Sequence, residues 1–160
     1  MERIAMRLTL HTDYALRVLM YVGAKGDALS RIPEIVERFG ISKGHVMKVV
    51  QRLGQRQYLE TIRGKRGGIR LARTPIQINV GAVVRDMEPE LGVLGCLREG
   101  EHYCLIEECC VLRRALRDAT NAFLATLDMY TLADLVKPRP ALARLLGLNE
   151  SRGRGVASAS

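Results

Sequence analysis

All four cysteines of the 160-residue chain lie in one short acidic stretch, CLREGEHYCLIEECC, at residues 96–110. Seven residues separate Cys96 from Cys104, five separate Cys104 from Cys110, and Cys109 is adjacent to Cys110. The stretch has no CxxC pair, which argues against a thioredoxin-like redox pair and against the paired knuckles of a zinc ribbon. Iron–sulfur centres accept wide and varied spacings, because several thiolates can converge from an irregular loop. The stretch therefore predicts an iron–sulfur site.

The adjacent pair limits the number of cysteine ligands. Neighbouring side chains diverge, so we expect Cys109 and Cys110 to supply one ligand and one bystander. Three thiolates then leave one position of the cluster open or filled by another group, as a sensor of a small molecule requires. The simpler alternative is a structural zinc site of three cysteines and His102, although His102 lies only two positions before Cys104.

Composition indicates the compartment in which this site would work. With 160 residues and 48% hydrophobic positions, the chain can bury a core without disulfides. Charged side chains interrupt the first 22 residues, so we expect neither a signal peptide nor a membrane span there. The expected protein is cytoplasmic, without a membrane partner. In a reducing cytosol, clustered thiols are expected to bind metal or do redox chemistry.

Charge is unevenly distributed along the chain. Residues 42–73 carry nine Lys or Arg and one acid, a net charge of +8 that equals the formal charge of the whole chain. Residues 86–110 carry seven acids and one Arg, a net charge of −6. The basic segment is therefore expected to contact a polyanion, and the acidic segment is not.

The basic segment has the pattern of a winged helix-turn-helix. Residues 31–40 predict a first helix that Gly40 ends, and Ser42 is expected to cap a second helix. Apolar residues recur at helical spacing in this second helix and form its buried stripe: Val46, Val49, Val50 and Leu53. Two short strands, 58–63 and 68–73, follow, and the basic turn GKRG joins them.

The expected DNA contacts lie on the second helix and on the tip of the wing. The helix would enter the major groove, while the wing would follow the backbone or the adjacent minor groove. The alternative to DNA binding is that the basic residues only form a solvated surface, as runs of charge usually do, or that the winged helix-turn-helix binds another protein. The turn, the basic helix face and the basic wing together favour DNA. The outer helix face also holds Arg52, and the candidate contacts are Ser42, Lys43, His45, Lys48, Arg63, Lys65 and Arg66.

The second half of the chain predicts further helices. Residues 78–87 form a helical stripe that ends at Pro89, and residues 111–130 predict an amphipathic helix of about five turns. This long helix could pack within its own chain or form a dimer seam, and we favour the seam because two half-sites multiply DNA specificity. The predicted fold is mainly α with a small β-hairpin wing. It comprises a winged helix-turn-helix domain at 1–80, a cluster-binding loop and dimerisation helix at 81–137, and a linker with a disordered tail at 138–160.

Several segments together resemble the Rrf2 family of winged-helix regulators. They are RLTLHTDYALRVLMYV, the wing RGKRGGIRLAR, the cysteine loop and DATNAFLATLDMYTLADLV, and the resemblance is strongest to members that sense nitric oxide. It implies a homodimer with paired long helices. It also implies an iron–sulfur cluster, 4Fe-4S favoured over 2Fe-2S, that is held by Cys96, Cys104 and Cys110, with Cys109 as the bystander.

The resemblance further implies that Asp13 of the partner subunit is the fourth ligand. His11, His102 and Cys109 are the alternatives for this position. In another state Asp13 could stabilise the start of its helix or pair with Arg17 at i,i+4 spacing. Members that regulate cluster biogenesis have a histidine ligand three residues after the last cysteine, where this chain has arginine, which favours the nitric-oxide-sensing members.

The function implied by the resemblance is repression of transcription. The cluster-loaded dimer would bind an inverted-repeat operator, and nitric oxide would attack the iron and release the DNA. Alternatives are a member of the same family that responds to iron or cluster supply, and a zinc-stabilised DNA-binding protein. A redox enzyme is an alternative of another class. The sequence has no nucleotide-binding glycine loop and no convincing catalytic dyad, so we expect no enzyme activity.

Overall fold

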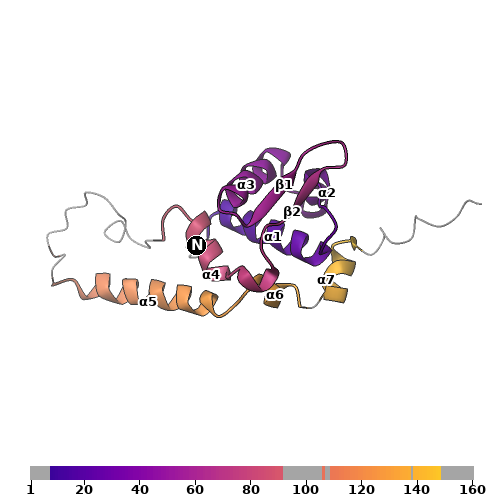
Figure 1. Cartoon of the computed structure of the whole chain (residues 1–160). Helices are drawn as coiled ribbons and strands as arrows, with labels where there is room; N and C mark the ends of the chain where they lie inside the picture. The colour runs from indigo at the N-terminus through magenta and orange to yellow at the C-terminus, as the bar shows by residue number, and fades with distance from the viewer. Residues whose placement is uncertain (1–7, 92–105, 107–108, 138, 149–160) are drawn as a thin grey trace, which may run out of the picture.

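The computed structural model describes residues 8–91, 106, 109–137 and 139–148. Within these residues the chain is mainly helical with one antiparallel β-hairpin, which confirms the predicted fold class (Figure 1). None of the helices in these ranges is long and apolar enough to cross a membrane. The elements in chain order are α1 (Leu10–Lys25), α2 (Ile32–Phe39), α3 (Lys43–Gln55), β1 (Leu59–Ile62), β2 (Gly68–Leu71), η1 (Pro75–Gln77), α4 (Val80–Met87), α5 (Val111–Asp128), α6 (Leu132–Leu135) and α7 (Arg139–Leu145).

Side-chain caps and glycines set the bounds of the first helices. Ser42 is the N-cap of α3, as predicted, and its hydroxyl accepts a hydrogen bond from the backbone nitrogen of His45 at 3.4 Å. Gly40 ends α2 in the left-handed region, with φ of 63°, where a side chain would be strained. The turn between α2 and α3 is therefore encoded locally.

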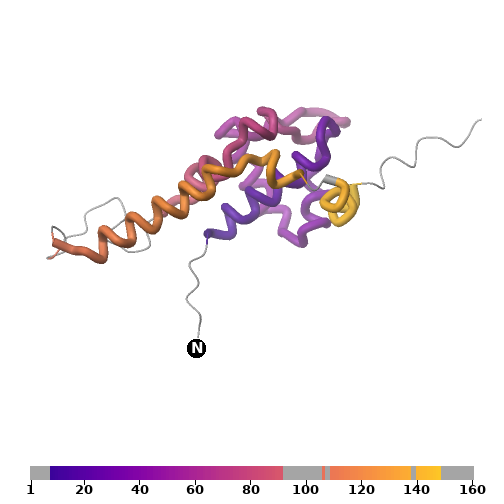
Figure 2. The backbone as a smooth tube through the Cα atoms, turned by 90° about the horizontal axis from the view of Figure 1, so that it is seen from below, coloured from indigo at the N-terminus to yellow at the C-terminus, as the bar shows by residue number. Residues whose placement is uncertain are grey.

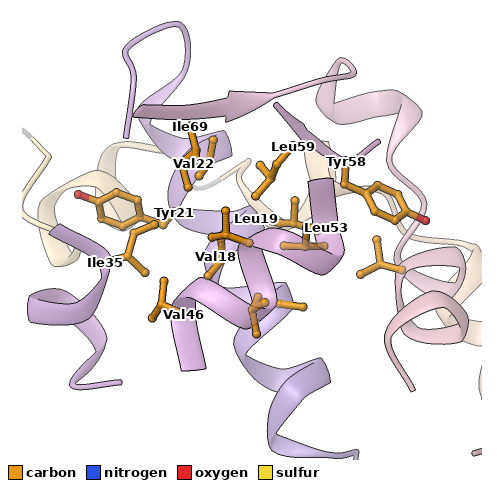
Figure 3. Close-up of a cluster of buried hydrophobic side chains, with 14 of the residues drawn as sticks. Val18, Leu19, Tyr21, Val22, Ile35, Val46, Leu53, Tyr58, Leu59 and Ile69 are labelled. Carbon is orange, nitrogen blue, oxygen red and sulfur yellow. The ribbon is translucent and has the colours of Figure 1, made fainter. Parts of the chain in front are cut away.

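The core lies around α1, against which α3 and the hairpin pack (Figure 3). The predicted stripe of α3 is buried, and Leu53 and Val46 are fully enclosed. Side chains from five elements, three helices and the two strands, converge there because each element turns its apolar face inward. They include Val18, Leu19 and Val22 of α1, Ile35 of α2, Val46 and Leu53 of α3, and Leu59 and Ile69 of the hairpin.

The wing is a short hairpin that a third segment extends. β1 pairs with β2 from Leu59 opposite Leu71 to Ile62 opposite Gly68, so each strand is shorter than predicted. Ser30 adds a bridge to Ile69 through two backbone hydrogen bonds of 2.9 and 2.8 Å. At Gly67 a Cβ would lie 2.1 Å from the carbonyl oxygen of Ile62, so the turn requires glycine.

α4 and α5 continue from the winged domain. α4 begins at Val80, so the predicted domain boundary at 80/81 falls at its first residue. Arg85 of α4 donates two hydrogen bonds, of 2.7 and 2.6 Å, to the carboxylate of Asp128 at the end of α5. The opposite end of α5 projects away from the body of the molecule (Figures 1 and 2). Val111 and Leu112 in that first turn are 72% and 59% exposed.

Part of the region 138–160 differs from the predicted linker and disordered tail. Residues 139–145 form α7, which packs against α1. Ala143 and Leu146 are buried and Leu142 packs beside them, because apolar side chains recur at helical spacing after Pro140. Residues 149–160 of the predicted tail lie outside the described residues.

We expect Tyr58→Phe to lower stability at neutral pH and to weaken alkaline destabilisation. Burial and the hydrogen bond to the Asp86 carboxylate, 2.7 Å long, raise the pKa of Tyr58 to about 12. Because this pKa lies above its ordinary value of 10, the phenol's contribution is fully present below pH 10 and is lost as pH rises towards 12. The loss at pH 7 should be about 1–2 kcal/mol.

Urea unfolding at several pH values between 7 and 11 measures both effects. Burial and Glu34 also raise the pKa of Tyr21 to about 12, so the variant should keep part of the alkaline loss. An unchanged pH dependence in Tyr58→Phe would show that the contact with Asp86 does not form in solution.

Candidate nucleic-acid interface and cysteine site

The outer face of α3 presents Lys43 and Lys48 to solvent, as expected for a DNA-reading helix. The same exposed face carries Gly44, Met47 and Gln51, which sequence reasoning missed. Their positions at 44, 47 and 51 follow helical spacing and could have indicated them. A Cβ added at Gly44 would have no other atom within 4 Å, so the helix backbone is open to close approach there.

Ser42 and His45 contact each other at the start of α3. The Ser42 hydroxyl lies 2.9 Å from His45 Nδ1, and it also accepts the backbone hydrogen bond that caps the helix. The His45 ring packs 5.9 Å from the ring of Tyr14 in α1, centroid to centroid. The pair therefore fixes the first turn of α3 against α1, while both side chains remain exposed.

The tip of the wing gathers the other predicted contacts. Arg63, Lys65 and Arg66 lie between β1 and β2 and are all exposed. Arg70 pairs with Glu60 across the hairpin, so that cation is already partnered within the wing. Both α3 and the loop joining the strands lie along the upper part of Figure 1. The structure thus supplies two basic surfaces, one on a helix and one on a hairpin.

Arg52 differs from its predicted position on the outer face. It is half-buried, and its guanidinium donates a hydrogen bond to the backbone oxygen of Asp86 at 3.3 Å. Arg56, which follows the same helix, forms an ion pair with the Asp86 carboxylate at 3.3 Å. Arg52 and Arg56 therefore attach one side of the end of α3 to α4.

The two described cysteines have different surroundings. Cys110 is the N-cap of α5, and its Sγ accepts a hydrogen bond from the backbone nitrogen of Arg113 at 3.3 Å. Cys109 is exposed, and its Sγ donates to the backbone oxygen of Ile106 at 3.5 Å. The partial positive charge at a helix N-terminus suits an anionic ligand at Cys110. The other predicted ligands and alternatives Cys96, Cys104 and His102 lie outside the described residues.

Asp13 lies in the first turn of α1, as the sequence predicts. Its carboxylate pairs with Arg17 through contacts of 3.1 and 3.0 Å, which confirms the expected i,i+4 pair. The two side chains are 40% and 46% exposed, and an exposed pair of this kind contributes only about 0.2–1 kcal/mol. Asp13 can therefore exchange Arg17 for another partner at small cost.

His11 lies close to Asp13 in the chain and lines a cavity of about 510 Å³ between the start of α1 and the ends of α3 and α4. Burial, and after it the charge of Arg52, lower the pKa of His11 and so favour the neutral imidazole. Neutral imidazole is the form that binds metals. Among the described residues, no three His, Cys, Asp or Glu side chains lie close enough to hold a metal ion.

Comparison with solved structures identifies the fold. CymR, the global cysteine regulator of B. subtilis, has a TM-score of 0.65 at 22% identity, with 83% of this chain and 98% of that chain covered. IscR of T. potens has a TM-score of 0.64 at 21% identity, with 99% and 97% covered. The fold is therefore shared with winged-helix regulators whose sequences have diverged widely.

Sequence comparison identifies the family. The HTH-type transcriptional regulator NsrR of Bacillus subtilis is 47% identical over 146 residues, which cover 91% of this chain and 100% of that protein. NsrR of Geobacillus kaustophilus is 46% identical, with 92% and 100% covered. These relatives are regulators and not enzymes, as expected. The Rrf2 family model, described as an iron-dependent transcriptional regulator, matches residues 8–138. The resemblance found in the sequence is thus confirmed, and the chain belongs to the Rrf2 family of transcriptional regulators.

Proposed function

We propose that this regulator is a cytoplasmic homodimer that represses transcription when loaded with an iron–sulfur cluster, and that nitric oxide is its signal. The observation that carries the proposal is the 40–47% identity, over about nine-tenths of the chain, to several regulators named NsrR. The exposed basic surfaces on α3 and on the wing support its DNA-binding part. The cluster and the signal follow from the resemblance of the cysteine loop and the first helix.

In this proposal α3 enters the major groove of an inverted-repeat operator. Lys43 and Lys48 contact phosphates or base edges, and Met47 and Gln51 join them from the same exposed face. Ser42 and His45 fix the first turn and lie at the groove edge. On the wing, the predicted contacts with the adjacent minor groove are Arg63, Lys65 and Arg66.

Lys48→Ala and Arg66→Ala are each expected to weaken operator binding and to reduce its salt dependence. Each variant removes one cation per subunit, and so two per dimer, from contacts with phosphate, so the slope of log affinity against log salt should fall by about 2. Fluorescence anisotropy at several salt concentrations measures this slope. Lys137→Ala is the matched control, because Lys137 is exposed after α6 and pairs with Asp134 at 2.6 Å. Unchanged slopes in both test variants would refute this assignment of contacts.

The proposed cluster ligands are Cys96, Cys104 and Cys110 of one subunit and Asp13 of its partner. The cap position of Cys110 and the weakly held carboxylate of Asp13 fit this role. When bound, the cluster supplies iron that nitric oxide can attack. We favour 4Fe-4S over 2Fe-2S, and His11, His102 or Cys109 could occupy the fourth position in place of Asp13.

The proposed dimer forms along α5. Leu112, Ala115, Ala119 and Ala122 are at least partly exposed in the single chain, whereas Leu124 is buried against it. A helix that packs on its own chain near one end and leaves apolar residues in solvent along the rest of its length is typical of a subunit interface. Pairing of these faces would bring the two α3 helices of the dimer, the reading helices that enter the major groove, onto one operator.

We expect Asp13→Ala to lose its cluster faster than the wild type and to respond differently to nitric oxide. Loss of the carboxylate removes one ligand and also leaves Arg17 without its partner at 3.0 Å. The decay of cluster absorbance under anaerobic conditions and during nitric oxide titration measures both effects. Asp27→Ala, at an exposed acid beyond the other end of α1, is the control. Normal cluster stability together with a normal response in Asp13→Ala would exclude this ligand.

Native mass spectrometry of the anaerobically purified protein tests the whole proposal. The expected result is a dimer that carries one 4Fe-4S unit per subunit. A 2Fe-2S unit would favour the second candidate, a regulator that responds to iron or cluster supply, which the family description as iron-dependent supports. A single zinc ion per subunit would refute the cluster and leave DNA binding as the surviving part.

A further inference from the structure

The end of α4 holds the start of α1 through one carboxylate. Glu88, the C-cap of α4, accepts hydrogen bonds from the backbone nitrogen of Thr9, at 3.2 Å from each carboxylate oxygen, and from the Thr9 hydroxyl at 3.1 Å. The hydroxyl of Thr12, which is fully buried, donates a third at 2.5 Å. All three donors belong to the N-cap and first turn of α1.

This arrangement makes the first turn of α1 depend on a distant part of the chain. The first backbone N–H groups of a helix have no partner within the helix, and a carboxylate near them is stabilising. Helices commonly receive such a carboxylate from their own first turn. Here it comes from 79 residues further along the sequence. A shift of the end of α4 must therefore move the start of α1 or break these bonds.

Glu88 stands where the cysteine-bearing segment leaves the winged domain. Only seven residues separate it from Cys96. On the other side, α1 reaches the reading helix through Tyr14, whose ring packs 5.9 Å from that of His45, and His45 contacts the N-cap Ser42. The carboxylate of Glu88 therefore connects the start of the cysteine segment to α1, and α1 in turn contacts the first turn of α3.

The junction also has room to move. The cavity of about 510 Å³ is lined by Thr9 and His11 of the α1 start, by Arg52 and Arg56 at the end of α3, and by Glu88. Because the bonds of Glu88 border this cavity, there is open space beside the contact between the start of α1 and the end of α4. A packed junction would instead resist such movement.

We propose that Glu88 is a positioning residue through which the segment carrying the cysteines sets the start of α1 and, through Tyr14 and His45, the first turn of the reading helix. This inference rests on the proposed function for its link to the cluster. Its consequence is that loss of the carboxylate lowers the operator affinity of the cluster-loaded protein towards that of the cluster-free protein, while the cluster stays bound.

The test uses the full-length variants Glu88→Ala, Glu88→Gln and Thr12→Val. Glu34→Ala is the matched control, since Glu34 also joins two helices, through Lys25 at 2.5 Å and Tyr21 at 3.4 Å, but near the other end of α1. For each protein, three quantities are measured: iron content, operator affinity with and without the cluster, and amide hydrogen exchange in the first turn of α1.

We expect Glu88→Ala to keep its iron, to exchange the first-turn amides of α1 faster, and to lose about tenfold in operator affinity when loaded. Glu88→Gln should recover part of this affinity because its amide oxygen still accepts hydrogen bonds, and Thr12→Val should show a smaller loss. Glu34→Ala should lower the midpoint temperature of thermal unfolding. Its operator affinity with the cluster, divided by its operator affinity without the cluster, should equal that of the wild type. An unchanged ratio in Glu88→Ala would overturn the inference.

If the proposed regulation by the cluster is wrong, the measurements differ from those expected if only the role of Glu88 is wrong. If wild-type protein binds the operator equally with and without the cluster, regulation by the cluster is refuted. The positioning role is then decided on the cluster-free proteins alone. Faster exchange together with weaker operator binding in Glu88→Ala supports it, and unchanged operator binding in that variant refutes it.

Discussion

Cys110→Ser is expected to abolish cluster-dependent operator binding while it leaves the fold intact. The substitution removes a proposed cluster ligand, so bound iron and sulfide should fall to background, and operator affinity should no longer depend on anaerobic cluster loading. Serine keeps the hydrogen bond to the backbone nitrogen of Arg113, because it is among the preferred N-cap residues. Iron and sulfide analysis, with operator binding measured on the same sample, tests this expectation.

The neighbouring cysteine provides the matched control. Cys109→Ser should keep the cluster, since Cys109 is exposed and its thiol contacts the backbone of Ile106 rather than the end of α5. Cys110→Ala removes the cap as well as the thiol and should be about 1 kcal/mol less stable than Cys110→Ser. Loss of iron in Cys109→Ser with retention in Cys110→Ser would reverse the roles of the two residues.

Leu53→Ala is expected to lower the free energy of unfolding by about 2–5 kcal/mol. Leu53 is 0% exposed and lies in the middle of the core formed by α1, α3 and the hairpin (Figure 3). Truncation loses the transfer free energy of the removed carbon atoms and leaves a cavity. This loss is a large part of the total stability of a small domain, which is about 5–15 kcal/mol. Operator binding should also weaken, because the packing that supports α3 is lost. Urea unfolding measures the loss.

Two controls separate packing from other effects of substitution in α3. Leu53→Met preserves volume and should cost less than about 1.5 kcal/mol. Gln55→Ala changes an exposed residue at the end of the same helix and should stay within about 0.5 kcal/mol of the wild type. A cost below about 1 kcal/mol for Leu53→Ala would mean that this part of the core packs more loosely than the close burial of Leu53 implies.

Local features of the fold could be predicted because short stretches of chain encode them. The cap at Ser42, the break at Gly40 and the buried stripe ending at Leu53 all follow from residue type and spacing within a few positions. The hairpin likewise follows from two short apolar-containing stretches on either side of a glycine-rich turn. These signals need no knowledge of distant residues, since caps, turns and helical faces depend on contacts within one or two turns.

Features of the candidate site that depend on distant contacts could not be predicted. Arg52 has the spacing of an outer-face residue, yet α4 lies beside it and accepts its hydrogen bond. Helical periodicity shows only which residues share a face. Which part of that face is covered depends on how neighbouring elements pack against it.

The sequence alone thus determined the winged helix-turn-helix, its basic surfaces, the concentration of cysteines in one acidic segment and the family resemblance. Tertiary structure decided that the carboxylate of Glu88 caps α1 from 79 residues away, and that α7 packs on the core rather than forming part of a linker. The physical reason is that a hydrogen bond or an apolar contact between distant segments requires the chain to bring them together. The spacing of residues along the sequence does not show which distant segments come into contact in the folded chain.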